Sequence, residues 1–368
     1  MVEKRLPLTV LTGFLGAGKS TLLNKVLAQP GGDKLALIVN EFGEIGLDHD
    51  LIEASSDEVV LMASGCLCCS IRGDLAQTVS RLLTRRARGQ LEFDRIVIET
   101  TGLADPVPIQ QTVLADPLLA RAVYLDGIVT VVDTVTGART LDAQFEAVSQ
   151  VATADLLLLS KTDRADPASI TALTQRLRGL NATADVRTTA DAAANPSMMW
   201  QRSAMRRDVS RNQAIDWLTP SQTAPNPLAN LSGLAGVALP DRTATLAHDG
   251  RISSASISLD EPLDDSVFDN WLDTLITLRG SQILRIKGIV FLEGIDHPFV
   301  FHGVQHVFDP PVPLKDWPDG DTCSRIVVIA RDVPEQELYR SFDMLRKNAA
   351  PKPRAFPDWQ PVAPKPSS

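Results

Sequence analysis

The chain has 368 residues, of which 44% are hydrophobic and 22% are charged, and its formal net charge is −9. This length suits two domains better than one, and the apolar content excludes a mostly disordered chain. A net negative chain lacks the basic surface that broad nucleic-acid binding requires, so we expect no nucleic-acid partner.

No pattern typical of a targeting or membrane-spanning segment is visible in the sequence. The first apolar run, over 6–12, is too short for a signal peptide, and the later apolar runs are far below spanning length. We therefore expect a cytoplasmic protein with reduced thiols and no membrane partner. Four cysteines are too few for a disulfide scaffold, so a cluster of them indicates a metal or redox site.

The first half of the chain alternates short apolar runs with helical stretches. Largely continuous apolar runs predict strands at 8–11, 35–40, 93–99, 127–133 and 155–160. Helical periodicity predicts helices at 20–29, 142–152 and 167–177. Continuous apolar strands suit a parallel sheet with helices on both faces. Residues 1–190 are therefore predicted to form an α/β domain with a mainly parallel, doubly wound sheet.

The pattern changes after residue 190. Residues 191–248 have weak periodicity and predict a linker region with one helix over 204–218. Residues 249–346 predict a smaller α+β domain with a largely antiparallel sheet, in which two helices accompany four strands. These elements fall at 252–259, 264–278, 283–292, 299–304, 325–330 and 335–345. Residues 347–368 contain six prolines and predict an extended, mobile tail.

The segment Gly13–Ser20 reads GFLGAGKS and matches the phosphate-binding pattern G-x-x-x-x-G-K-[ST]. It follows the first predicted strand and opens the first predicted helix, which is the context this motif needs. Residues 1–190 are therefore predicted to be a P-loop NTPase domain. Its glycines let several backbone N–H groups point at phosphate oxygens, while Lys19 neutralises the β- and γ-phosphates and Ser20 ligates Mg²⁺. The candidate nucleotide-binding residues here are Gly13, Gly16, Gly18, Lys19, Ser20 and Thr21.

Two later segments support a nucleotide site. A hydrophobic strand ends at Glu99, whose carboxylate can reach the Mg²⁺ shell, and the backbone N–H of Gly102 can approach the γ-phosphate. The segment Ser160–Asp163 reads SKTD and resembles the element by which GTPases recognise guanine, with Lys161 and Asp163 as binding residues. The Asp163 carboxylate can accept two hydrogen bonds from guanine, and adenine lacks that donor pair, so GTP is favoured over ATP.

Three of the four cysteines lie in the segment Gly65–Cys69, which reads GCLCC. Thiolates bind Zn²⁺, Co²⁺ and Ni²⁺, and three of them leave a position for another ligand, which suits a metal that must be released. A redox pair is the alternative interpretation. The candidate metal ligands are Cys66, Cys68, Cys69, Glu41 and Glu44. The isolated Cys323 is expected to be a packing residue.

Together these motifs resemble the CobW-type GTPases, a P-loop family of metallochaperones. The resemblance covers roughly residues 6–345 and is carried by Gly13–Ser20, Asn40–Gly43, Gly65–Cys69, Glu99–Gly102 and Ser160–Asp163. It implies a slow GTPase that binds a transition metal, first zinc and otherwise cobalt or nickel, at the cysteine loop. Nucleotide turnover then controls delivery to a client apo-protein, with Lys19, Glu99 and Glu41 as candidate catalytic residues. A homodimer that depends on metal or nucleotide is a further expectation.

Two other functions stay open from the sequence. The residues also fit an ATP-using P-loop kinase of a small molecule, or a non-catalytic zinc-binding regulator whose loop binds nucleotide without turnover. The chain lacks the His-rich stretch that many relatives carry, and its five histidines are scattered. His302 and His306 fall on a predicted strand and turn, so we interpret them as fold or surface residues. The client protein is left open.

Overall fold

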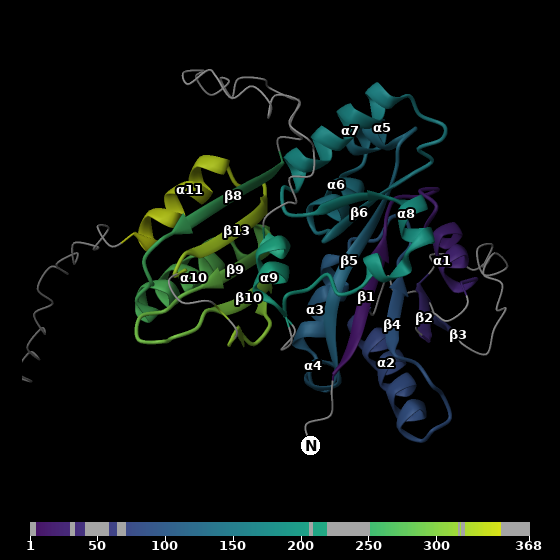
Figure 1. Cartoon of the computed structure of the whole chain (residues 1–368), viewed down its shortest axis with the longest axis horizontal. Coiled ribbons are helices and arrows are strands. Elements are labelled where there is room, and N and C mark those ends of the chain that lie inside the picture. The colour runs from purple at the N-terminus through teal and green to yellow at the C-terminus, as the bar shows by residue number, and fades with distance from the viewer. Residues whose placement is uncertain are drawn as a thin grey trace, which may run out of the picture.

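The computed structural model describes residues 5–29, 34–40, 59–64, 71–205, 209–218, 251–315, 317 and 321–346, with the backbone alone at 40, 59–64 and 71–74. These residues form two sheets, one in each half of the chain, each with its own helices (Figure 1). Within the described residues, no helix has the length and apolar character that crossing a membrane requires.

The first sheet has seven strands in the order β3-β2-β4-β1-β5-β6-β7, and every neighbouring pair is parallel. Its strands are β1 (Leu6–Thr12), β2 (Leu35–Asn40), β3 (Val59–Ser64), β4 (Arg95–Glu99), β5 (Val123–Asp133), β6 (Leu156–Ser160) and β7 (Asp185–Thr188). The predicted parallel α/β sheet is confirmed, although the sequence patterns do not predict β3 and β7. The central strand β1 lies between β4 and β5, so the loop after β1 leaves from the middle of the sheet.

Eight helices among the described residues accompany this sheet. They are α1 (Lys19–Leu27), α2 (Ile71–Ala87), α3 (Val107–Ala115), α4 (Pro117–Ala122), α5 (Gly137–Ala143), α6 (Phe145–Ala152), α7 (Pro167–Leu180) and α8 (Thr189–Ala194). Helices α2, α3 and α4 pack on the side chains of one sheet face, whereas α1 and α8 pack on the other. The predicted single helix over 142–152 is wrong at its start, because extended backbone at Gln144 separates α5 from α6.

The segment after α8 leads to α9 (Arg211–Leu218), which packs on the second sheet. The predicted helix over 204–218 is wrong for Ala204 and Met205, which lie outside any helix. The reason is local: the backbone N–H of Met205 donates to Ser203 Oγ at 3.1 Å, a side-chain turn that competes with helix formation.

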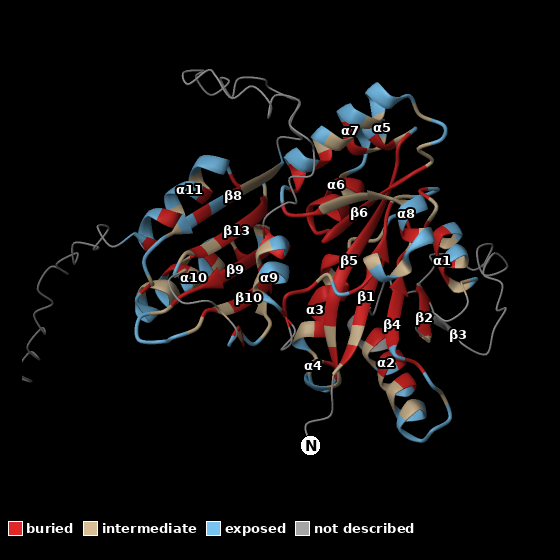
Figure 2. Cartoon of the chain, viewed as in Figure 1, coloured by how far each residue is buried: buried red, intermediate tan, exposed pale blue. Residues whose placement is uncertain are grey.

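The second sheet is antiparallel in the order β11-β10-β9-β13-β8, and β12 pairs with β10. Its elements are β8 (Ile252–Leu259), α10 (Asp265–Arg279), β9 (Ile283–Val290), β10 (Phe299–Val304), β11 (Val307–Phe308), β12 (Val312–Pro313), β13 (Ser324–Arg331) and α11 (Glu335–Phe342). Helices α10 and α11 cover one face and α9 contributes to the other. Figure 2 shows the strands of both sheets mostly buried and the outer faces of the helices exposed. The predicted smaller α+β domain is confirmed.

A buried ion cluster joins the two halves of the chain. Arg285 on β9 donates from Nη2 to both carboxylate oxygens of Asp155, at 2.7 and 2.8 Å, and Lys287 Nζ donates to Asp155 Oδ1 at 2.8 Å. All three side chains are at most 3% exposed. Burial alone would raise the pKa of Asp155, but the charges of Arg285 and Lys287 hold it well below its usual range. Burial and the Arg285 charge lower the pKa of Lys287 to about 8, against the opposing effect of Asp155.

Candidate functional site

The loop between β1 and α1 has the shape that a phosphate-binding loop requires. Gly13, Gly16 and Gly18 have φ values of 140°, 70° and 96°, which favour glycine. A Cβ on Gly13 would lie 2.3 Å from the backbone oxygen of Val131, so the loop packs against β5 too closely for any side chain. Gly18 is the N-cap of α1, and the unpaired N–H groups of a helix N-terminus favour an anion such as phosphate.

Lys19 lies inside this loop rather than on the surface. Its side-chain nitrogen donates to the backbone oxygen of Gly13 at 2.8 Å and to that of Phe14 at 3.5 Å, and the residue is 9% exposed. The loop carbonyls therefore hold the ammonium group beside the loop's own backbone. A cation in this position is suited to neutralising phosphate oxygens. By contrast, Thr21 is exposed on α1.

Ser20 and Glu99 meet, although they are 79 residues apart in sequence. Ser20 Oγ donates to Glu99 Oε1 at 2.8 Å, and Glu99 is 4% exposed at the end of β4. The hydroxyl and carboxylate oxygens of these two residues are ligands of the kind that Mg²⁺ prefers. Nearby, the buried Thr101 hydroxyl has no hydrogen-bond partner in the described part of the chain. The hydroxyl and carboxylate groups gathered here therefore fit a hydrated magnesium ion and a phosphate.

The segment after β4 packs tightly on the phosphate-binding loop. A Cβ on Gly102 would lie 2.4 Å from the backbone nitrogen of Leu15, so only glycine fits there. Gln150 on α6 donates from Nε2 to the backbone oxygens of Gly102 at 3.1 Å and Ala104 at 3.0 Å. No sequence pattern marks Gln150, because a buried helix face does not indicate a contact 48 residues away.

Lys161 connects the segment after β6 to the same loop. Its backbone has a φ of 55°, and Nζ donates to the backbone oxygen of Gly16 at 2.9 Å and to Asp133 Oδ2 at 2.7 Å. Burial raises the pKa of Asp133, but hydrogen bonds from Lys161 and the Val135 backbone, with the Lys161 charge, bring it below its ordinary value. Asp133 ends an apolar strand just as Glu99 does, and that signal points to it from sequence alone.

Asp163 follows Lys161 by two residues and is open to solvent. Its side chain is 79% exposed and lies 3.8 Å from the guanidinium of Arg164. A carboxylate so exposed, on a segment tied to the phosphate-binding loop by Lys161, is accessible to a base bound beside that loop. Of the predicted nucleotide residues, the structure thus brings together the loop glycines, Lys19, Ser20, Glu99, Gly102 and Lys161.

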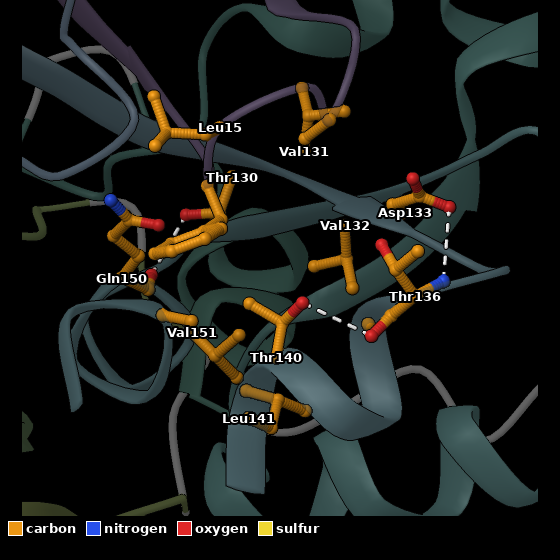
Figure 3. A pocket seen from close by; sticks show the side chains of 14 residues that line it. Leu15, Thr130, Val131, Val132, Asp133, Thr136, Thr140, Leu141, Gln150 and Val151 are labelled. Atoms are coloured by element: carbon orange, nitrogen blue, oxygen red, sulfur yellow. Dashed lines mark hydrogen bonds between the residues drawn. The ribbon is translucent and has the colours of Figure 1, made fainter. Parts of the chain in front are cut away.

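A small pocket that opens to solvent lies beside the phosphate-binding loop (Figure 3). Its lining includes Phe14, Leu15, Thr130, Asp133, Thr140 and Gln150. Figure 3 shows Gln150 and Asp133 on opposite sides of it. The loop, β5, α5 and α6 all contribute to its wall, and most of the lining side chains are apolar.

The predicted metal ligands Glu41, Glu44, Cys66, Cys68 and Cys69 lie outside the described residues. Among the residues that are described, no group of three or more His, Cys, Asp and Glu side chains is placed to hold a metal ion. Cys323 is half-buried, and burial raises the pKa of its thiol. His302 is buried in the second sheet and His306 is exposed.

Two family models match the chain. The model described as "CobW/HypB/UreG, nucleotide-binding domain" matches residues 7–188. The model described as "Cobalamin synthesis protein cobW C-terminal domain" matches residues 252–346. The two matched ranges coincide closely with the parallel sheet and the antiparallel sheet, respectively.

Relatives match over nearly the whole length. The zinc chaperone YjiA of Escherichia coli K12 is 32% identical over 342 residues, covering 92% of this chain and 98% of that protein. The zinc-regulated GTPase metalloprotein activator 1 of Schizosaccharomyces pombe is 30% identical over 349 residues, covering 89% of this chain and 82% of that protein. The crystal structure of Zn(II)-bound YjiA GTPase from E. coli is similar, with a TM-score of 0.70, 29% identity and coverage of 94% of this chain and 100% of that chain.

Proposed function

Since this chain belongs to the family that joins a CobW/HypB/UreG nucleotide-binding domain to a cobW C-terminal domain, we propose that it is a GTP-dependent zinc chaperone. Binding and slow, metal-responsive hydrolysis of GTP control the capture of zinc and its delivery to a client apo-metalloprotein in the cytoplasm. The contact of Ser20 Oγ with Glu99 beside the Lys19 loop carries the nucleotide part of this proposal. The names of the relatives, a zinc chaperone and a zinc-regulated GTPase, support the metal part.

Different residues of the site are proposed to bind the phosphates, to neutralise their charge and to hold Mg²⁺. The glycines of the loop and the α1 N-terminus bind the phosphates, Lys19 neutralises them, and Ser20 with Glu99 holds Mg²⁺. When bound, Mg²⁺ stabilises the negative charge of the phosphate oxygens. The backbone N–H of Gly102 is proposed to face the γ-phosphate. Glu41, outside the described residues, is proposed as a further catalytic residue.

The cargo metal is proposed to bind near the carboxyl ends of the parallel strands, where the nucleotide is also proposed to bind. Asn40 and Ser64 are register partners at the ends of the parallel strands β2 and β3, and Glu99 ends the next strand, β4. Glu41 and Cys66 therefore follow in sequence from the carboxyl ends of β2 and β3, the end of the sheet at which Glu99 also lies. This connectivity supports control of the metal site by the nucleotide. Zinc is the proposed cargo, and cobalt and nickel remain alternatives that thiolate chemistry allows.

The match of the two family models to 7–188 and 252–346 supports domain bounds of 1–190 and 249–346, joined by 191–248 and followed by 347–368. GTP, GDP and the client are the proposed partners, together with a homodimer that forms with metal or nucleotide.

The choice of guanine is tested at Asp163. Asp163→Ala removes the only carboxylate proposed to pair with the guanine edge, so the preference for GTP over ATP should fall about a hundredfold. Competition of each nucleotide against a fluorescent GDP analogue measures it. Arg164→Ala, the exposed neighbour, should leave the preference unchanged. Equal competition by ATP in the unaltered chain would contradict the guanine assignment and favour the small-molecule kinase.

The metal site is tested by replacing Cys66 and Cys68 with serine together. Loss of two thiolates should weaken zinc binding by more than about a hundredfold and leave GDP affinity unchanged. Competition with a chromogenic chelator, with Mg²⁺ and a non-hydrolysable GTP analogue present, measures the zinc affinity. Cys323→Ser is the matched control and should bind zinc normally. Unchanged zinc affinity in the double variant refutes the site, and absence of phosphate release with or without zinc favours the non-catalytic regulator.

A further inference from the structure

Two consecutive residues of α6 hold the segment that follows β4. Gln150 is 1% exposed, and its amide nitrogen donates to the backbone oxygens of both Gly102 and Ala104. The neighbouring Ser149, also 1% exposed, donates from Oγ to Asp105 Oδ1 at 3.0 Å. Asp105 in turn accepts from the backbone N–H of Val107 at the start of α3.

The start of the same segment is held from β1 instead. The backbone N–H of Thr100 donates to the oxygen of Leu11 at 2.9 Å, and the Thr100 hydroxyl donates to Thr12 Oγ1 at 2.7 Å. The Thr100 hydroxyl also lies 3.1 Å from the Thr101 oxygen, and the backbone N–H of Ala104 donates to that oxygen at 3.2 Å. The Thr101 oxygen and the Gly102 N–H belong to one peptide group, so the turn from Thr101 to Ala104 holds that N–H. Gln150 holds the other side of this turn, because its amide nitrogen donates to the oxygens of both Gly102 and Ala104. It therefore supports the position of the Gly102 N–H through the turn rather than through the peptide group that carries it.

We propose that Gln150 is a positioning residue that holds the backbone of Gly102 so that its N–H faces the γ-phosphate of a bound nucleoside triphosphate. This proposal rests on the proposed function. Gln150 touches no nucleotide itself and acts through the loop carbonyls. Because the Gly102 N–H meets only the third phosphate, Gln150 matters for the triphosphate and not for the diphosphate. A residue needed only for packing would affect both nucleotides alike.

The test compares two affinities in the full-length chain with Mg²⁺ present. Gln150→Met keeps the size of the side chain and removes both donors. We expect its affinity for a non-hydrolysable GTP analogue to fall about tenfold, with GDP affinity unchanged within about twofold. Ser149→Ala removes the neighbouring support and should shift the same ratio by about threefold. Gln175→Met, at an exposed position of α7, should change neither affinity.

Equal weakening of both nucleotides by Gln150→Met, or no weakening of either, overturns the proposal. If Gln150→Met does not fold, as judged by circular dichroism and loss of GDP binding, Ser149→Ala decides the question by the same ratio. Failure of the proposed function looks different, because the unaltered chain then binds neither nucleotide, and the positioning proposal falls with it.

Discussion

Replacing Lys19 with methionine is expected to lower the rate of phosphate release from GTP by about a thousandfold. The ammonium group is held inside the loop by the Gly13 and Phe14 oxygens, whereas Lys161 bonds to the Gly16 oxygen and is paired with Asp133. Methionine retains the length of the side chain and removes only the charge and its donors. A phosphate-release assay with saturating GTP and Mg²⁺ measures the loss, and titration of the GTP analogue shows how much of it is binding.

Lys25 provides the control for this experiment. It is exposed in the last turn of the same helix, so Lys25→Met removes an equal charge from α1 without touching the loop. Its phosphate release should stay within about twofold of the unaltered chain. Release by Lys19→Met at the rate of this control would show that the loop does not bind the reacting phosphate.

Replacing Asp155 with alanine should lower the free energy of unfolding by about 3–5 kcal/mol. The variant leaves Arg285 and Lys287 buried at the junction of the two halves without their counter-charge. It also removes the acceptor for the backbone N–H of Ile128, which donates to Asp155 Oδ2 at 3.0 Å. Urea unfolding followed by circular dichroism gives the change, with the midpoint and the slope fitted separately.

Two further variants provide comparisons, one at an exposed ion pair and one within the buried cluster. Asp343→Ala breaks an exposed pair with Arg346, whose side chains are 59% and 62% exposed, and should change stability by less than about 1 kcal/mol. Changing Asp155, Arg285 and Lys287 together to Leu, Met and Met should recover most of the loss, since apolar residues can replace a buried ion cluster. A loss below about 1 kcal/mol in Asp155→Ala would mean that the cluster is solvated in the folded protein.

The strands that the sequence predicts best are those buried on both faces. The runs that form β2 and β6 are continuously apolar, and their predicted bounds agree with the structure to within one residue. By contrast, β7 is a four-residue edge strand of half-buried, mostly polar residues, so neither composition nor alternation marks it. The break between α5 and α6 at Gln144 could not be predicted either, because the helical periodicity continues from one helix into the next.

In the candidate site, too, the residues of contiguous motifs could be predicted and the contacts between distant segments could not. The phosphate-binding motif is contiguous, so residues 13–20 can be recognised from the sequence of that segment alone. Glu99 can be predicted from its place at the end of an apolar strand. The supporting contacts are long-range. Lys161 meets Asp133 across 28 residues, Gln150 meets Gly102 across 48 and Arg285 meets Asp155 across 130. Lys161, Asp133 and Gly102 each carry a signal in their own segment, but a single sequence does not indicate which residues meet across such separations.

The Asp155 cluster also limits how this chain can be recombined with its relatives. A hybrid that takes its first half from this protein and its second half from another must receive two cations at the places of Arg285 and Lys287. Without them the buried Asp155 carboxylate has lost its counter-charges, and in the reverse hybrid Arg285 and Lys287 lose theirs unless the other first half supplies a carboxylate. The two halves are therefore expected to be inherited as a matched pair, and exchange of one half alone to succeed only between chains that share all three charges.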